Sequence, residues 1–358
     1  MTPIPDSCRR AGVVGLGLIG GSVALALREQ GFEVFGEDHD ESTEANALSE
    51  GVIDGVGIPS DVEIVFIATP VDAVADNVER VLASSDAWVT DTGSVKGPIV
   101  SAIKNPRFVA GHPMAGSEQS GLSGSRADLF QGAVWVLAPG PDTSDEAFAA
   151  VHELIAGFGS DPVTVEAAAH DRIVATVSHV PHLTAAALMN VASKRSDEHL
   201  AMLRLAAGGF RDMTRIASGS PDIWPPICVH NADAIQEALS EVIDALVTLR
   251  SAVVNKNVDV LRDLLGAARA ARVNLPTAVP LPKNLAEIRV RVKDQRGELA
   301  SLTALAAELD VNIYDLEIAH SAEGPTGVVV LLINATMSDR LQGGLLARGY
   351  RPSVRTLS

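Results

Sequence analysis

The sequence predicts an α/β protein with three folded parts: a doubly wound parallel sheet, an all-helical middle and a small C-terminal domain of βαββαβ order. Apolar strand-like runs alternate with helical stretches in the first half, long Ala- and Leu-rich segments follow, and strands return near the C-terminus. The predicted boundaries are 1–165, 166–275 and 285–358, with a proline-rich linker at 276–284.

The composition narrows the possible functions. A chain of 358 residues with 47% hydrophobic and 20% charged residues is typical of soluble proteins that build a core. A formal net charge of −17 argues against nucleic-acid or anionic membrane partners. No apolar signal core or membrane-spanning segment is found. Cys8 and Cys228 lie far apart without metal-ligand spacing, so we expect a cytoplasmic protein without a metal site.

A glycine-rich turn follows the first apolar run. Gly15 allows a tight strand-to-helix turn, Gly17 lets the backbone approach a diphosphate, and Gly20 lets the helix pack closely on the strand. The diphosphate would sit at the helix N-terminus. Because a strand precedes the turn and an Ala- and Leu-rich helix follows it, we predict that this turn, including Leu18 and Ile19, binds a dinucleotide.

The second predicted strand ends in the acidic pair Glu37 and Asp38. Asp38 follows Gly15 by 23 positions, near the spacing of a ribose-binding carboxylate, and Glu37 is the alternative ligand. His39 comes next, and no basic cluster occurs before Arg80, so nothing obvious would hold a 2′-phosphate. The sequence therefore favours NAD over NADP; the alternative is an ordinary α/β sheet that binds no nucleotide.

Further strands complete the predicted Rossmann-type sheet. Thr69 and Pro70 follow one of them, and strand ends in such sheets face the cofactor, so we predict that both lie along the NAD. Pro70 could instead simply start a helix. The predicted strands are Glu63–Ala68, Trp88–Asp91, Phe108–Gly111, Ala133–Leu137 and Pro162–Val165.

Long helices are predicted at Ala167–Ser193 and Asp233–Val254. Their apolar faces are too extensive for one small bundle, so we expect a homodimer. The stretch Val273–Asn284 contains Pro276, Pro280 and Pro282 and is predicted to be a stiff linker. The C-terminal domain is predicted to contain strand Leu285–Val292, helix Glu298–Leu309, strands Val311–His320 and Thr326–Ile333, helix Ser338–Arg348 and a strand near Tyr350–Val354.

Four separated segments carry possible chemistry. Two follow predicted strands, D-T-G-S-V-K-G at 91–97 and G-H-P-M-A-G-S-E at 111–118, and both should open onto the nicotinamide. The others are S-H-V-P-H at 178–182 and G-G-F-R-D-M-T-R-I-A at 208–217, which is followed by Trp224. Together, and in this order, they resemble the prephenate dehydrogenase family, which includes arogenate and cyclohexadienyl dehydrogenases.

The resemblance spans roughly Arg10 to Arg250 and implies an NAD-dependent enzyme of tyrosine synthesis. The family takes a hydride from the ring carbon that bears the hydroxyl of prephenate, releases carbon dioxide and leaves 4-hydroxyphenylpyruvate. Arogenate or dual-substrate activity is the alternative within the family. A catalytically inactive sensor of NAD and an amino acid is the alternative from another class.

The resemblance also implies roles for individual residues. His112 would accept a hydrogen bond from the ring hydroxyl, and Ser94 would hold both that hydroxyl and the imidazole; the other role open to Ser94 is capping the following helix. Arg215 would bind a substrate carboxylate through its guanidinium fork.

The remaining pocket positions implied by the resemblance are His182, Glu118, Asp212 and Trp224, with Glu118 as a possible partner of Arg215. His179 is either a residue that supports this pocket or a structural histidine. The other histidines match no motif and are assigned no role: His152, His170, His199, His230 and His320.

The turn from Asp294 to Gly297 resembles the ligand-binding turn of ACT regulatory domains, in which glycine lets the backbone contact an amino acid. Tyrosine, the end product of the implied pathway, is the expected effector. The alternative is that the C-terminal domain only extends the dimer interface.

Overall fold

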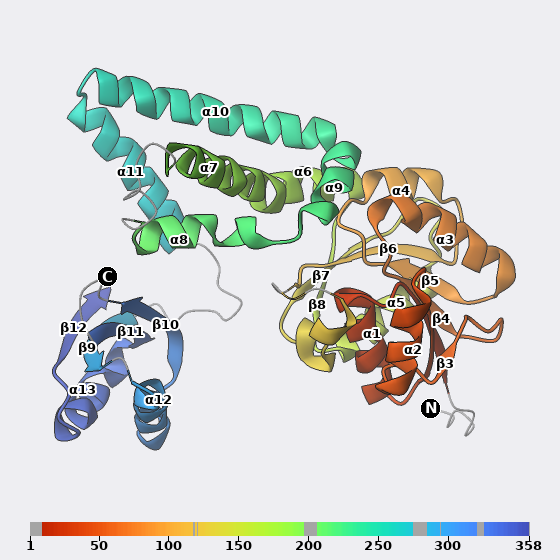
Figure 1. Cartoon of the computed structure of the whole chain (residues 1–358), viewed down its shortest axis with the longest axis horizontal. Coiled ribbons are helices and arrows are strands. Elements are labelled where there is room, and N and C mark those ends of the chain that lie inside the picture. The colour runs from red at the N-terminus through yellow and green to blue at the C-terminus, as the bar shows by residue number, and fades with distance from the viewer. Residues whose placement is uncertain are drawn as a thin grey trace. The chain divides into compact units, whose positions relative to one another are not determined.

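A computed structural model describes residues 9–116, 119, 121–196, 206–274, 285–293, 295–320 and 326–357 (Figure 1). Its internal contacts divide the chain into two compact units. The first comprises Met1–Asp197 and Thr214–Ser251, and the second comprises Glu198–Met213 and Ala252–Ser358.

The first unit contains an eight-stranded sheet with the order β3-β2-β1-β4-β5-β6-β7-β8. Its first six strands have the order of a Rossmann sheet, so this part of the predicted fold class is confirmed. Apolar, β-branched runs form its central strands, and β4 is buried along its whole length. The strands are β1 Arg10–Val14, β2 Glu33–Glu37, β3 Gly55–Val56, β4 Ile64–Ile67, β5 Trp88–Asp91, β6 Phe108–Pro113, β7 Val134–Ala138 and β8 Asp161–Thr164.

The sheet is not parallel throughout, which corrects the expectation of a wholly parallel sheet. Strand β7 pairs with β6 in the antiparallel sense, with Ala110 opposite Ala138, and β8 then runs parallel to β7. The described part of the β6–β7 connection contains only short 3-10 turns, at Leu122–Gly124 and Ala127–Phe130. Without a crossover helix to carry the chain back, the next strand returns in the opposite direction.

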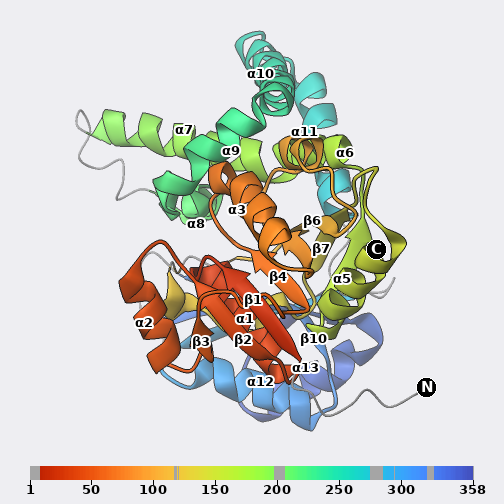
Figure 2. The same ribbon diagram turned by 90° about the vertical axis from the view of Figure 1, so that its right-hand side faces the viewer.

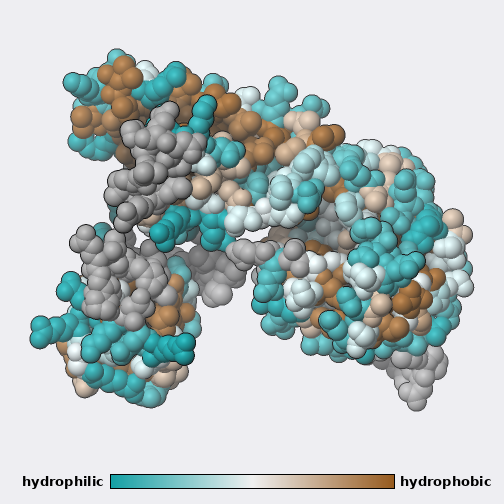
Figure 3. Space-filling view, in the orientation of Figure 1, coloured by the Kyte–Doolittle hydropathy of each residue, from teal (hydrophilic) through white to brown (hydrophobic). Residues whose placement is uncertain are grey.

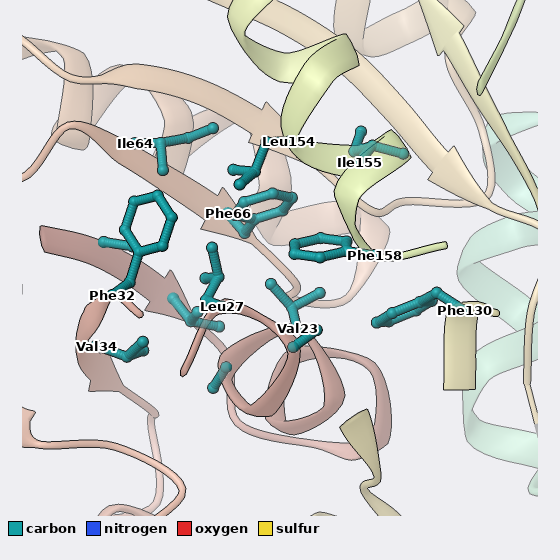
Figure 4. Packing of buried hydrophobic residues seen from close by; sticks show 14 of the residues in the cluster. Val23, Leu27, Phe32, Val34, Ile64, Phe66, Phe130, Leu154, Ile155 and Phe158 are labelled. Carbon is teal, nitrogen blue, oxygen red and sulfur yellow. The ribbon is translucent and has the colours of Figure 1, made fainter. Parts of the chain in front are cut away.

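Helices cover both faces of this sheet. Helices α1 and α5 pack on one face, where Phe66 of β4 lies beside Phe158 and below Leu154 (Figure 4). Helix α3 packs on the other face through Val74, Val78 and Val81, and Figure 2 shows it on one side of β4. The helices are α1 Leu18–Glu29, α2 Glu41–Ser49, α3 Val71–Ser84, α4 Gly97–Ala102 and α5 Asp145–Gly157.

The helical segment that follows the sheet departs from the sequence prediction at one point. Instead of one helix over Ala167–Ser193, α6 ends at Val174, a π-helical turn covers Ala175–His179, and α7 runs over Val180–Ser196. The N–H of Val180 donates to the carbonyl of Ala175, five residues earlier. Pro181 lacks an N–H and its ring would clash with an earlier carbonyl, so the helix widens just before it.

Further helices follow in the two units, and one of them, α10, carries an exposed apolar face. Ile243, Leu246 and Val247 are exposed on α10, where hydrophobic residues gather along the helix in Figure 3. Among the described helices, none combines the length and apolarity that a membrane span requires. The remaining helices are α8 Gly208–Thr214, η5 Arg215–Ser218, η6 Pro221–Ile223, α9 Trp224–His230, α10 Ala232–Val254 and α11 Val258–Val273.

The C-terminal part of the second unit is a four-stranded antiparallel sheet with the order β10-β11-β9-β12. Two helices pack on it through a small core that includes Ile288, Leu302, Leu331 and Leu341. The elements follow the predicted βαββαβ order: β9 Leu285–Lys293, α12 Glu298–Glu308, β10 Ile313–His320, β11 Thr326–Asn334, α13 Ser338–Ala347 and β12 Pro352–Leu357. The predicted linker at 276–284 lies outside the described residues.

Candidate active site

The three glycines of the turn between β1 and α1 have different surroundings. Gly15 has a φ of +90°, and a Cβ there would lie 2.6 Å from the carbonyl oxygen of Ala68. A Cβ on Gly20 would lie 1.8 Å from the carbonyl oxygen of Gly15. A Cβ on Gly17 would meet nothing within 4 Å, so the backbone there faces open space at the start of α1. This cradle fits the diphosphate of a dinucleotide.

Asp38 and Glu37 point to different partners. The carboxylate of Asp38 is nearly buried and accepts a hydrogen bond from the backbone N–H of Leu16, at 2.7 Å, so it lies against the glycine turn. Glu37 instead forms an ion pair with Arg80 of α3. The structure therefore brings Asp38, and not Glu37, to the turn, and Arg80 is already paired with a carboxylate.

The end of β4 offers a polar group without a partner. The Oγ1 atom of Thr69 is buried and forms no hydrogen bond within the described part of the chain. Pro70 immediately precedes α3, so it does start a helix, as the alternative interpretation proposed. The unpaired hydroxyl of Thr69 beside the glycine turn is available to a bound ligand, because a buried polar group without a partner is costly.

A buried ion pair joins the ends of β5 and β6. The fully buried ammonium of Lys96 contacts the carboxylate of Asp91 and donates to the carbonyl oxygen of Gly111 at 2.7 Å. Asp91 also accepts from the N–H of Gly111, at 3.1 Å. Burial lowers the pKa of Lys96, against the attraction of Asp91 and Asp171. The structure thus brings together the two strand-end segments that the sequence singled out.

Ser94 lies in the turn held by this ion pair, but it does not cap α4. The carboxylate of Asp171 does so instead, accepting from the N–H groups of Lys96 at 2.8 Å and Gly97 at 2.7 Å. The capping role considered for Ser94 is therefore wrong, because a carboxylate from a distant helix reaches these N–H groups. No hydrogen bond from the half-buried Ser94 side chain is found among the described residues.

His112 is buried on β6, and its ring contacts a second histidine. Its Nδ1 lies 2.9 Å from Nε2 of His170, whose Nδ1 lies 2.8 Å from Oδ1 of Asp171. Burial, followed by the charges of Lys96, His170 and His179, lowers the pKa of His112 well below its usual 6.5. His112 is therefore neutral at pH 7. The sequence alone assigns His170 no role; its only signal is the adjacent acid near the start of a long helix.

The remaining aromatic and polar side chains gather around the π-helical turn. Nδ2 of Asn231 donates to the carbonyl of Asp171 at 2.9 Å and lies 3.3 Å from Nδ1 of the buried His179. Burial lowers the pKa of His179 to about 4. The ring of His182 stacks on Trp224, with centroids 3.5 Å apart and planes 14° apart. The structure therefore brings His179, His182 and Trp224 together.

Of the three remaining predicted site residues, two are exposed and one lies outside the described residues. Arg215 is exposed on η5, which packs against α7, the helix that carries His182. Asp212 is exposed on α8. Glu118 lies outside the described residues. Within the described ranges, no three His, Cys, Asp or Glu side chains converge on a possible metal site.

Comparisons with known proteins agree on one family. Residues 23–163 match the family model for the prephenate dehydrogenase nucleotide-binding domain, and residues 166–267 match the model for the prephenate dehydrogenase dimerization domain. The first match begins just after the glycine turn.

Individual relatives cover most of the chain. It is 32% identical over 336 residues to the prephenate dehydrogenase of Bacillus subtilis (strain 168), covering 88% of this chain and 90% of the relative. The cyclohexadienyl dehydrogenase of Zymomonas mobilis is 30% identical over 280 residues, covering 74% of this chain and 95% of the relative.

Solved structures show the same relationship. Prephenate dehydrogenase from A. aeolicus, in complex with hydroxyphenyl propionate and NAD+, matches with a TM-score of 0.71 and 28% identity, over 75% of this chain and 99% of that one. Synechocystis arogenate dehydrogenase matches with a TM-score of 0.65 and 30% identity, over 75% and 100%. The glycine turn, the strand-end segments and these matches together show that the chain belongs to the prephenate dehydrogenase family.

Proposed function

We propose that this chain oxidises prephenate with NAD, releases carbon dioxide and yields 4-hydroxyphenylpyruvate for tyrosine synthesis in the cytoplasm. The observation that carries the proposal is the buried, neutral imidazole of His112 at the same edge of the sheet as the glycine turn. NAD is the cofactor, and when bound it supplies the hydride acceptor. The residues that would hold it are the glycines of the turn with Leu18 and Ile19, together with Asp38, Thr69 and Pro70.

His112 and Ser94 are the proposed catalytic residues. A neutral imidazole accepts a hydrogen bond from the ring hydroxyl and takes its proton as the carbonyl forms. The Ser94 hydroxyl, which has no partner of its own among the described residues, can orient the same hydroxyl. Both groups are held by the strand-end network, so little reorganisation is needed during the reaction.

Arg215 is the proposed anchor of a substrate carboxylate, because a guanidinium fork binds a carboxylate through two hydrogen bonds. His182, stacked on Trp224, contributes a polar edge next to an aromatic surface, which suits a ring substrate. Glu118 and Asp212 are proposed as further pocket residues, and His179 as a residue that contacts or supports the substrate.

Steady-state assays of the purified chain test this proposal. NADH formation is measured with prephenate and with arogenate, each with NAD and with NADP. We expect turnover of prephenate with NAD. Preference for arogenate would assign the chain to the alternative activity, since the two substrates differ only in a keto or amino group. Absence of turnover with every combination, in folded protein that binds NAD, would favour the inactive sensor.

Replacing Asp38 by alanine is expected to raise the dissociation constant for NAD by about 10-fold or more, because the ribose hydroxyls lose a charged acceptor. Isothermal titration calorimetry with NAD measures this change. Glu37→Ala is the matched control, since Glu37 is paired with Arg80 and should affect NAD binding little. If the two variants show the opposite order, Glu37 is the ribose ligand.

We propose that the chain forms a homodimer through its helical region. The matched dimerization domain and the exposed apolar residues of α10 support this assignment. An apolar face of this kind is costly in water and is suited to burial against a second copy.

We also propose that the C-terminal βαββαβ domain is an ACT-like domain of ferredoxin-like fold that binds tyrosine. Its support is the strand order β10-β11-β9-β12 and the turn before α12, where Gly297 has a φ of +92° and a Cβ would meet nothing within 4 Å. Such a glycine leaves backbone groups open to an amino acid. Asp294, the other residue assigned to this turn, lies outside the described residues.

L-Tyrosine is therefore expected to inhibit the full chain, with an affinity coupling of about 5- to 150-fold between effector and substrate. Gly297→Val should abolish this inhibition and leave the uninhibited kcat unchanged, because a side chain is strained at this φ and fills the open space. Gly343→Ala on α13 is the control in the same domain. If tyrosine, phenylalanine and tryptophan all fail to inhibit the full chain, the domain has a purely structural role.

A further inference from the structure

The hydrogen bonds around His112 form a chain that ends on a carboxylate. His112 contacts His170 at 2.9 Å, and His170 contacts Asp171 at 2.8 Å. All three side chains are buried; His112 comes from β6, whereas His170 and Asp171 are consecutive residues of α6. Two elements far apart in the sequence therefore meet through these three side chains.

Which atoms donate in this series of hydrogen bonds follows from the ionisation of Asp171 at its end. Burial alone would raise the pKa of Asp171, but hydrogen bonds from His170 and from the N–H groups of Lys96 and Gly97 outweigh it and lower the pKa. The carboxylate is therefore ionised and can only accept, so His170 carries its proton on Nδ1. With that proton on Nδ1, Nε2 of His170 is the ring nitrogen that can accept, and His112 then donates from its own Nδ1.

We infer that His170 and Asp171 are positioning residues that hold His112 in the tautomer with an unprotonated Nε2. The inference rests on the role of His112 as hydrogen-bond acceptor in the proposed function. An unprotonated Nε2 can accept the hydrogen bond of a substrate hydroxyl, whereas the other tautomer would direct an N–H at that hydroxyl and could not take its proton.

The same carboxylate also fixes the turn that carries Ser94. Asp171 accepts from the N–H groups of Lys96 and Gly97, which begin α4 directly after that turn. One buried group therefore determines both the tautomer of His112 and the position of the segment around Ser94.

Two variants of His170 separate positioning from packing. His170→Leu replaces the imidazole by an apolar side chain of similar size and so removes the acceptor, and we expect kcat with prephenate and NAD to fall by about 10²-fold. The KM for prephenate and the dissociation constant for NAD should change by less than about twofold, since neither binding contact is removed. His170→Gln retains an acceptor and is expected to recover at least about 10-fold of the lost kcat. His152→Leu makes the same change at an exposed histidine of α5 and is the control.

Nitrogen-15 NMR of histidine-labelled protein reads the tautomer without any reference to activity. Signals of His112 are identified by their loss in His112→Asn. We expect a protonated Nδ1 and an unprotonated Nε2 in the natural chain, and loss of this preference in His170→Leu. A protonated Nε2 in the natural chain would overturn the inference, as would a folded His170→Leu variant with full kcat.

The outcomes also distinguish this inference from the proposed function. A natural chain that does not turn over prephenate would contradict the proposed function, while the NMR result would still decide the tautomer. If His170→Leu does not fold, the spectrum of the natural chain and that of His170→Gln decide.

Discussion

Replacing His112 by asparagine is expected to lower kcat by about 10²–10⁴-fold, the range for loss of a general base. Asparagine keeps a polar group in the buried position but cannot take a proton from the ring hydroxyl. Because the glycine turn and Asp38 are untouched, the dissociation constant for NAD should stay nearly the same. Steady-state kinetics with prephenate, together with calorimetric titration of NAD, measures both quantities.

The pH dependence of the natural chain provides a second measurement of the same residue. Since burial and the charges of Lys96, His170 and His179 lower the pKa of His112 well below 6.5, the imidazole remains neutral as the pH decreases through 6.5. kcat/KM should therefore fall only at a clearly lower pH, where His112 becomes protonated. For the substitution of His112, His152→Asn at an exposed position serves as the control.

A His112→Asn variant that loses only NAD affinity would contradict the assignment of His112 as the base.

Replacing Lys96 by methionine is expected to reduce the free energy of unfolding of the first unit by about 3–5 kcal/mol. The substitution leaves the carboxylate of Asp91 buried without its cation, and removes the donor to the carbonyl of Gly111. Chemical denaturation followed by tryptophan fluorescence measures this change, because all three tryptophans of the chain lie in the first unit: Trp88, Trp135 and Trp224.

Two further variants make this measurement specific. Lys104→Met removes an exposed lysine and should change the free energy of unfolding little. In the double variant Lys96→Met with Asp91→Asn, part of the lost stability should return, since no uncompensated charge remains. Unfolding of Lys96→Met at the same denaturant concentration as the natural chain would show that the ion pair does not stabilise this edge of the sheet.

Local sequence predicted the glycine turn and most elements because their causes are local. A strand-to-helix turn by itself leaves no room for a side chain at Gly15 or Gly20. A short apolar, β-branched run such as β4 forms a buried strand whichever strands lie beside it. The direction of β7 was not predictable in this way. Val134–Ala138 has the same apolar character in either direction, and only the path of the preceding connection makes the strand antiparallel to β6.

The network around His112 could not be predicted because its partners are distant in sequence. His170 follows His112 by 58 residues, and Asp171 follows Lys96 by 75. Neither residue belongs to a motif with a fixed spacing, so their roles depend on how α6 packs beside α4. The resemblance of the segment at 111–118 to the prephenate dehydrogenase family identified His112, whereas only the three-dimensional arrangement identified the groups that contact it.

The π-helical turn at Ala175–His179 sets the rotation of α7 about its axis relative to α6. A regular helix advances about 100° per residue, so removing one residue from this wide turn would rotate α7 by about that angle relative to α6. His182 would then turn away from Trp224, with which it stacks at 3.5 Å, because Trp224 lies on α9, which packs on α3. The sheet, His112 and His170 all precede the turn and would stay in place. A single-codon deletion could therefore redirect a whole row of side chains in one evolutionary step.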